Sequence, residues 1–232
     1  MKIEVFADDE ATALAAAKKI AAEAVAAVSA RGRFVMAVSG GHTPWIMLRA
    51  LAKEDLPWKR VHITQVDERV APAGHPDRNL THLREALLSD HSPIPPEQIH
   101  AMPVESANLE DAARQYGAVL TELAGSPPTL DLVHLGLGPD GHTASLVPGD
   151  PVLDVTDRDV ALTGIYQGRR RMTLTYPVIN RARRILWLAT GGEKVGMLLR
   201  LRQSDLSIPA GRVCQDRAVI FADRAAAAEL AA

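Results

Sequence analysis

The sequence of 232 residues contains only one cysteine and no long apolar run. Because Cys214 has no second cysteine to pair with, it cannot form an internal disulfide, which favours a reducing compartment. The chain lacks the run of about 18 apolar residues that a membrane-spanning helix needs. Its acidic residues 8–10 stand where a secretory signal peptide requires an apolar stretch. We therefore expect a soluble, cytoplasmic chain with no membrane partner.

An excess of charge of either sign is also missing. The 26 basic and 28 acidic residues give a formal net charge of -2, which excludes a strongly basic nucleic-acid-binding protein. The 47% hydrophobic content excludes a disordered chain. Lysine is scarce, with Lys194 the only one after Lys59. An anionic ligand would therefore have to be held by a local group of cations.

Strand-like and helix-like segments alternate along the chain, and no repeat or linker divides residues 1–232. Strands are predicted at 2–6, 33–38, 61–66, 98–102, 130–137, 171–175, 185–189 and 219–221, and helices at 11–30, 45–52, 80–88, 109–123 and 193–201. Residues 67–79 match neither period and are predicted to be a loop. This order predicts one α/β domain with a mostly parallel sheet, helices on both faces, and ligands at the carboxyl ends of the strands.

A first glycine-rich turn, Ser39-Gly40-Gly41-His42-Thr43-Pro44, joins a predicted strand to a predicted helix. Its backbone N–H groups, hydroxyls and helix N-terminus suit a phosphate or a carboxylate, although glycines also occur in turns only to relieve backbone strain. The turn lacks the Gly-Lys-Ser/Thr of a P-loop. Ala37 occupies the first glycine position of a nucleophile elbow, so Ser39 is not expected to be a nucleophile.

A second glycine-rich turn, residues 136–142, matches G-x-G-x-x-G after a strand. Asp140 would place a negative charge beside a pyrophosphate, and Pro148 interrupts the helix that should follow, so a nicotinamide or flavin site is disfavoured. Asp140 and His142 instead place a carboxylate and an imidazole two residues apart. Such a pair can position a general base, although a histidine in a turn can also be purely structural.

Charged residues stand near other predicted strand ends. The segment Asp67-Glu68-Arg69 follows the third strand and, considered alone, is typical of a solvated cluster. Within the run 169–171, Arg171 is placed best to point along its strand. Lys194 lies at the start of a helical pattern, where a cation opposes the helix dipole and an anion would compensate. The histidines show no metal-ligand spacing, so no metal site is expected.

Together these segments resemble the 6-phosphogluconolactonase family of the pentose phosphate pathway. The motifs that carry the resemblance are Ser39 to Pro44, Asp67-Glu68-Arg69, Gly136 to Gly149, Arg171-Met172-Thr173 and Gly192-Glu193-Lys194. They span nearly the whole chain in the order typical of the family. The resemblance implies a Rossmann-like α/β sandwich with a small inserted lobe, shared with glucosamine-6-phosphate deaminases and ribose-5-phosphate isomerases. It also implies that no cofactor is used.

The resemblance implies hydrolysis of 6-phosphoglucono-1,5-lactone by water, with His142 as general base and Asp140 fixing its orientation or charge. The expected contacts to phosphate or substrate are Ser39, Gly40, Gly41, His42, Thr43, Asp67, Arg69, Arg171 and Lys194. The only partner expected is the small sugar-phosphate substrate, and the chain is expected to be a monomer. The resemblance also implies a substrate loop that includes His75, Arg78 and Asn79. Ala71, Arg78 and Val147 differ from the residues usual in the family, so the motifs support this loop less strongly than the other contacts.

Two other functions fit the same fold class. A glucosamine-6-phosphate deaminase would carry a catalytic glutamate before Pro-Gly, whereas Leu146 and Val147 precede Pro148-Gly149 here. A sugar-phosphate-sensing regulator would normally carry a helix-turn-helix segment, and this sequence begins directly at its first predicted strand. Lactone hydrolysis is therefore the prediction, and fold alone would not separate the three.

Overall fold

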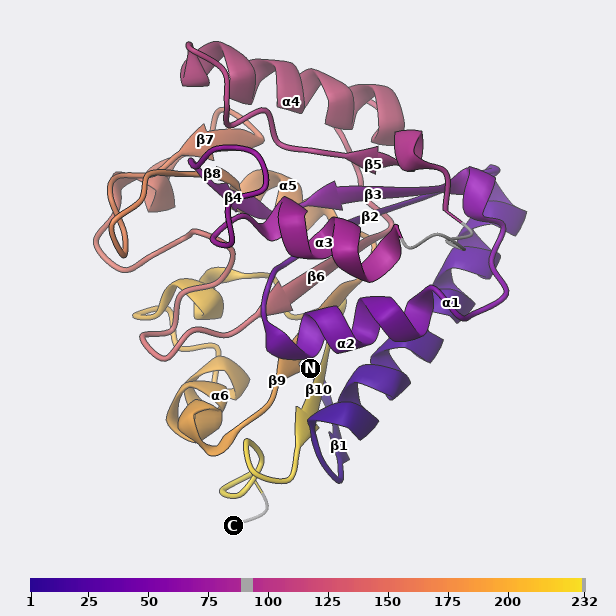
Figure 1. Ribbon diagram of the computed structural model, residues 1–232. Coiled ribbons are helices and arrows are strands. Elements are labelled where there is room, and N and C mark those ends of the chain that lie inside the picture. Colours follow the sequence, from indigo (N-terminus) through magenta and orange to yellow (C-terminus); the bar gives the residue numbers. More distant parts are fainter. Residues whose placement is uncertain (89–93, 231–232) are drawn as a thin grey trace.

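The computed structural model describes residues 1–88 and 94–230, which form two sheets and their covering helices (Figure 1). The larger sheet has seven strands in the order β1-β10-β9-β6-β2-β3-β5, and all of its neighbouring strands are parallel. Its strands are β1 (Lys2–Phe6), β2 (Phe34–Val38), β3 (Val61–Gln65), β5 (Ile99–His100), β6 (Leu132–Gly136), β9 (Ile185–Ala189) and β10 (Ala218–Asp223). The prediction of an α/β fold with a mostly parallel sheet is confirmed.

The smaller sheet is antiparallel and has the order β4-β8-β7. Its strands are β4 (Asp67–Arg69), β7 (Val160–Leu162) and β8 (Arg171–Leu174). The prediction that residues 67–79 form a loop is therefore wrong at its beginning, and β7 was not predicted. Three residues are too few to show a period of two, and β4 is a strand only because β8, distant in the sequence, pairs with it.

Helices cover both faces of the larger sheet (Figure 1). One face is covered by α1 (Asp9–Arg31), α2 (His42–Leu51) and α3 (Asn79–Leu87), the other by α4 (Leu109–Ala124), α5 (Tyr176–Arg181), α6 (Val195–Arg202) and the smaller sheet. Successive strand residues point to opposite faces, so Phe34 and Met36 pack against α1 and α2 while Val35 and Ala37 pack on the far side. Within the described residues, no helix is long and apolar enough to cross a membrane.

Local capping accounts for the ends of the longest helix. The side chain of Asp8 accepts a hydrogen bond of 2.8 Å from the backbone N–H of Ala11 at the start of α1. Gly32 ends the helix in the left-handed conformation, with φ of 76°. Short 3₁₀ turns connect other elements: η1 (Trp58–Arg60), η2 (Pro96–Gln98), η3 (Pro151–Asp154), η4 (Gly192–Lys194) and η5 (Pro209–Arg212).

The order of the strands reverses between β2 and β6. From β2 the chain builds outward through β3 to β5, and from β6 it builds in the opposite direction through β9 to β10. In open α/β sheets a ligand crevice forms at such a reversal, beyond the carboxyl ends of the strands. The two glycine-rich turns, residues 39–43 and 136–142, follow these two strands and therefore meet at the crevice.

A buried ion pair holds the segment between β4 and α3 in place. The side chains of Glu68 and Arg78 are 0% and 2% exposed, with 3.1 Å between Glu68 Oε2 and Arg78 Nε. Glu68 also accepts hydrogen bonds of 2.8 Å from the backbone N–H groups of Asn79 and Leu80, which caps the start of α3. Glu68 and Arg78 therefore serve the architecture, and β4 is left to present its neighbours Asp67 and Arg69.

We predict that Arg78→Met lowers the free energy of unfolding by about 3–5 kcal/mol, because it leaves the Glu68 carboxylate buried without its cation. Arg158→Met is a matched control, since Arg158 pairs with Asp157 at the surface, where an ion pair contributes little. Urea unfolding followed by circular dichroism measures both variants. Equal stability losses in the two variants would contradict the role assigned to the buried pair.

Candidate active site

A cleft of about 210 Å³ lies at the carboxyl ends of β2 and β6, where the strand order reverses. Its lining residues come from the turns after β2 and β6, from β4, from the starts of α3 and β8, and from η4. They are Ser39, Gly40, Gly41, Asp67, Arg69, Asn79, Gly136, Leu137, Gly138, Pro139, His142, Ala144, Arg171 and Lys194. Segments far apart in the sequence thus meet in one cleft.

Most of the predicted site residues line this cleft, namely Ser39, Gly40, Gly41, Asp67, Arg69, His142, Arg171 and Lys194. Asp140 does not line the cleft but contacts His142. The side chain of His42 is 81% exposed and lies 3.5 Å from Asp9 on α1, outside the cleft. Thr43 shares a hydrogen bond of 2.7 Å with Thr190. Phosphate contact by the His42 or Thr43 side chain is therefore not favoured by the geometry.

The imidazole of His142 is held by Asp140. Asp140 Oδ1 lies 2.5 Å from His142 Nδ1 and also accepts a 3.1 Å hydrogen bond from the backbone N–H of His142. Because an ionised carboxylate only accepts, this contact places the imidazole proton on Nδ1 and the free lone pair on Nε2. A Cβ atom at Gly138 would collide with the imidazole, so the absence of a side chain at Gly138 makes room for His142.

The hydrogen bonds at Asp140 also keep its carboxyl ionised. Partial burial would raise the pKa of Asp140, but the hydrogen bonds from the His142 side chain and backbone, the His142 charge and the Tyr166 hydroxyl together hold this pKa below its ordinary value. Asp140 is therefore ionised at neutral pH and accepts a hydrogen bond from the Nδ1–H group of His142.

Three cations line the cleft. Arg171 is almost fully buried, and its burial together with the nearby Arg69 cation lowers the pKa of its guanidinium, which stays protonated. Arg69 donates a 2.6 Å hydrogen bond to Asn79 Oδ1. Lys194 approaches only its neighbour Glu193, at 3.6 Å, among the ion pairs of the described residues. This local positive charge suits a ligand that carries a phosphate.

Asp67 offsets part of that charge and links β4 to the segment after β6. Its Oδ2 accepts a 2.6 Å hydrogen bond from the hydroxyl of Ser145 and lies 4.0 Å from Arg171 Nη1. Ser145, from the segment after β6, also lies 3.4 Å from Arg171 Nη1. The carboxylate of Asp67 therefore helps to hold Arg171 in position at the cleft.

The three arginines of the run 169–171 make different contacts. Arg169 donates a 2.8 Å hydrogen bond to Asp77, and Arg170 lies 3.5 Å from Glu110, so both are engaged outside the cleft. Arg171 alone of the three lines the cleft. The sequence left open which of the three faces the site, and the structure places Arg171 at the cleft.

A buried histidine of β6, His134, makes a hydrogen bond to the turn after β2. The backbone N–H of Ser39 donates a 3.2 Å hydrogen bond to Nδ1 of His134. Burial lowers the pKa of His134 to about 3, so its ring is neutral and can accept. Gly41 has φ of 134° and precedes α2, whose first backbone N–H groups have no partners within the helix. The turn is therefore held in a shape that can receive an anion.

Asn79, the first residue of α3, also lines the cleft, at the end of the segment 67–79 that the sequence predicted only as a loop. It accepts from Arg69 and donates a 3.0 Å hydrogen bond to the carbonyl of Asp67. A Cβ atom at Gly40 would collide with the Asn79 side chain, so the two segments are in close contact. His75, by contrast, accepts from the backbone N–H of Asp77 and does not line the cleft.

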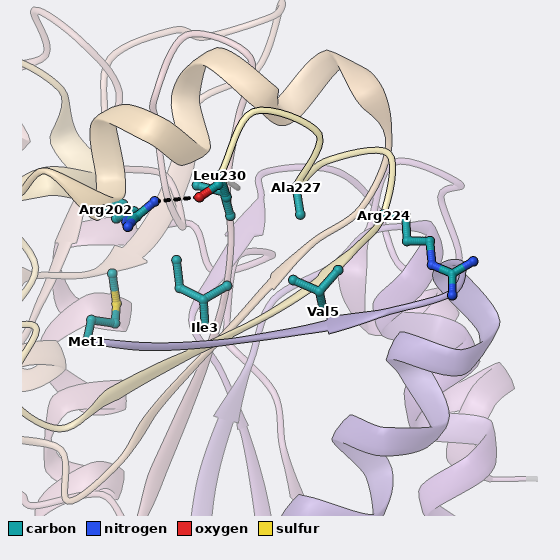
Figure 2. Close-up of a pocket in the computed structure, with 7 residues that line it drawn as sticks. All are labelled: Met1, Ile3, Val5, Arg202, Arg224, Ala227 and Leu230. Carbon is teal, nitrogen blue, oxygen red and sulfur yellow. Dashed lines mark hydrogen bonds between the residues drawn. The ribbon is translucent and has the colours of Figure 1, made fainter. Parts of the chain in front are cut away.

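A larger cavity of about 550 Å³ lies elsewhere, between the edge strand β1, the end of α6 and the C-terminal segment (Figure 2). Ile3 and Val5 point toward the C-terminal segment, and Arg202 donates a 2.9 Å hydrogen bond to the carbonyl of Leu230. Among the described residues that line it, none carries a side-chain carboxylate or an imidazole. The smaller cleft is therefore the candidate active site, because it alone of these two cavities combines a general base with cations. In the described residues, no group of three or more His, Cys, Asp or Glu side chains could hold a metal ion.

Comparison with known proteins identifies the family of this chain. Residues 7–221 match the family described as glucosamine-6-phosphate isomerases/6-phosphogluconolactonase. The chain is 43% identical to a 6-phosphogluconolactonase of Synechocystis sp. over 172 residues, which cover 72% of this chain and 71% of the relative. It is 36% identical to a 6-phosphogluconolactonase of Nostoc sp. over 98% of both chains.

A solved structure gives the same result for the fold. The 6-phosphogluconolactonase of Trypanosoma brucei has a TM-score of 0.85 and 28% identity, over 99% of this chain and 98% of that one. Both the match of the family model and the full-length similarity to the Nostoc relative cover almost all of the chain. This protein therefore belongs to the glucosamine-6-phosphate isomerase/6-phosphogluconolactonase family.

Proposed function

We propose that the chain hydrolyses 6-phospho-D-glucono-1,5-lactone to 6-phosphogluconate, the lactonase step of the oxidative pentose phosphate pathway. The observation that carries the proposal is the Asp140–His142 pair, at 2.5 Å, beside a cleft lined by Arg69, Arg171 and Lys194. A general base and a phosphate site are the two parts that this substrate requires. The names of the relatives at 36–43% identity support the same reaction.

The reaction begins with water as the nucleophile. Nε2 of His142 takes a proton from the water as its oxygen adds to C1 of the lactone, which forms a tetrahedral oxyanion. Collapse of this intermediate breaks the bond between C1 and the ring oxygen, and His142 returns its proton to the departing oxygen. Asp140 holds the Nδ1–H side of the ring throughout and stabilises the imidazolium. No covalent enzyme intermediate is needed.

We assign the phosphate of the substrate to the cations that line the same cleft. A phosphate group carries about -1.5 to -2 charges at neutral pH, which two or three converging cations can balance. Arg171 and Lys194 with the Ser39–Gly41 turn are the proposed phosphate site, and Arg69 is an additional contact to the phosphate or the oxyanion. A cytoplasmic location and a monomeric state remain predictions.

The deaminase alternative lacks a residue that it needs. A glucosamine-6-phosphate deaminase would use a glutamate immediately before Pro-Gly, where this chain has Leu146 and Val147. Both side chains are apolar, with 0% and 4% exposure, and pack into the core. These residues pack in the core and supply no acid for a deaminase, which favours lactone hydrolysis over deamination.

We predict that His142→Asn lowers kcat by about 100- to 10,000-fold with little change in KM, because a general base acts mainly in the transition state. Acid release from freshly generated 6-phosphogluconolactone in a pH-stat measures the rate above spontaneous hydrolysis. His42→Asn is the matched control, since its exposed side chain lies outside the cleft and its loss should leave the rate unchanged. Activity of His142→Asn within about threefold of wild type would remove His142 from the mechanism.

A second prediction concerns Lys194 and the phosphate. A charge-assisted contact contributes about 1.5–3 kcal/mol, so Lys194→Met should lower kcat/KM for the phosphorylated lactone about 10- to 150-fold. The same variant should hydrolyse unphosphorylated gluconolactone at nearly the wild-type rate, because the two substrates differ only in the phosphate. Equal losses on both lactones would place Lys194 at the reacting end of the substrate or in the fold.

A third prediction is that hydrolysis requires neither a metal ion nor a nucleotide. We expect full activity after exhaustive treatment with EDTA and dialysis, because the proposed mechanism uses only water and protein side chains. The pH-stat assay again gives the rate. Inactivation that one particular metal ion reverses would overturn this prediction.

A further inference from the structure

A tyrosine that the sequence analysis did not single out contacts the base from a neighbouring hairpin. The hydroxyl of Tyr166 donates a 3.0 Å hydrogen bond to Asp140 Oδ2, the carboxylate oxygen that does not contact His142. Its ring meets the His142 ring edge-on, with 5.4 Å between centroids. Both oxygens of Asp140 are thus engaged, so the carboxylate cannot rotate away from the imidazole.

The same tyrosine contacts the proposed phosphate site. The guanidinium of Arg171 lies over the Tyr166 ring, 4.9 Å from its centroid, and donates a 3.0 Å hydrogen bond to the side chain of the next residue, Gln167. Tyr166 therefore contacts both Arg171, which is assigned to the substrate phosphate, and the Asp140–His142 pair, which is assigned to the lactone carbonyl. In the described structure, no other side chain contacts Asp140, His142 and Arg171 together.

The hairpin that carries Tyr166 has a defined shape. Tyr166 and Arg169 exchange backbone hydrogen bonds of 2.9 and 3.2 Å across a two-residue turn. The two central residues, Gln167 and Gly168, have φ of 50° and 78°, the conformation that matches the twist of antiparallel strands. This turn joins β7 to β8 through short flanking segments, so the position of Tyr166 is coupled to that of Arg171 at the start of β8.

Core packing does not explain Tyr166. Tyr116 is buried in the hydrophobic core and Tyr176 packs against it, whereas Tyr166 belongs to neither core cluster. Its ring is half-buried, and its neighbour Ile165 is 81% exposed. Burial and the hydrogen bond to Asp140 raise the pKa of the Tyr166 hydroxyl, which therefore stays protonated and available as a donor.

We propose that Tyr166 is a positioning residue for the hydrolysis: it locks the Asp140 carboxylate against His142 and aligns this pair with Arg171. The inference rests on the proposed function. Tyr166 acts through the base and touches no reacting atom. A substrate whose phosphate is held by Arg171 then has its lactone carbonyl at a set position relative to His142, and small errors in such alignment are costly in rate.

The test is Tyr166→Phe, which keeps the ring contacts with His142 and Arg171 but removes the hydrogen bond to Asp140. We expect kcat to fall about tenfold with KM changed less than twofold, and by the same factor on phosphorylated and unphosphorylated lactones. Ile165→Ala, on the same hairpin, should retain wild-type kinetics. Wild-type kcat in Tyr166→Phe, or a loss confined to KM, would overturn the proposal.

A double variant shows whether Tyr166 acts through Asp140. In the Asp140→Ala background, Tyr166→Phe should cost less than twofold in kcat, because the carboxylate that accepts from Tyr166 is already absent. Losses that multiply would contradict the proposal. Tyr166→Ala removes the ring as well and should add a rise in KM for the phosphorylated lactone alone, because Arg171 loses its support.

A spectroscopic measurement separates this proposal from the proposed function. In protein labelled with ¹⁵N-histidine, the Nδ1–H signal of His142, identified by its loss in His142→Asn, should be present in the wild type and move or broaden in Tyr166→Phe. An unchanged signal would show that Tyr166 does not position the base. A changed signal in a protein that does not hydrolyse the lactone would retain the positioning role and overturn the function instead.

Discussion

The reversal of strand order between β2 and β6 is the constraint on which the site depends. Successive parallel strands are joined by crossovers that pack on the faces of the sheet, and at the reversal the two connections leave in opposite directions. The turns after β2 and β6 therefore face each other across a crevice. The glycines of both turns make room for neighbouring side chains, because a Cβ atom would collide with Asn79 at Gly40 and with His142 at Gly138.

The small antiparallel sheet completes this crevice. The strand β4 places Asp67 and Arg69 at the cleft, and β8 places Arg171 there, in a register that pairs Arg69 with Arg171. Two neighbouring arginines repel each other, and the structure offsets this with the buried Asp67 and its hydrogen bond from Ser145. A phosphate would complete the compensation, so the unbalanced cations are themselves a reason to expect an anionic ligand.

The chemistry of the site depends on charge that is arranged locally. With a formal net charge of -2, the whole chain cannot attract an anionic substrate by its overall field. Under the proposed function, the local cations that would bind a sugar phosphate are Arg69, Arg171 and Lys194, which line one cleft together with the turn after β2. His134 has a role in this turn that only its burial reveals, since a neutral ring can accept from the Ser39 N–H and a charged one could not.

The local features of this protein could be predicted from its amino-acid sequence. The alternation of strands and helices, the two glycine turns, the adjacency of Asp140 and His142, and the family resemblance could all be read from short segments, because periodicity, φ preference and motif spacing act within a few residues. The α/β fold was predictable for the same reason. Of the predicted contacts, the side chains of His42 and Thr43 lie outside the cleft, because the first turn of α2 directs them toward Asp9 and Thr190.

The features that join distant segments of the chain became visible only in the folded structure. The pairing of β4 with β8, the burial of Glu68 against Arg78, and the contact of Tyr166 with Asp140 all link residues that no local pattern relates. A three-residue strand has too little period to be seen, and whether a carboxylate faces solvent or an arginine depends on which chain segment covers it. The motifs thus indicated the type of reaction, whereas tertiary packing determines which side chains position the residues of the site.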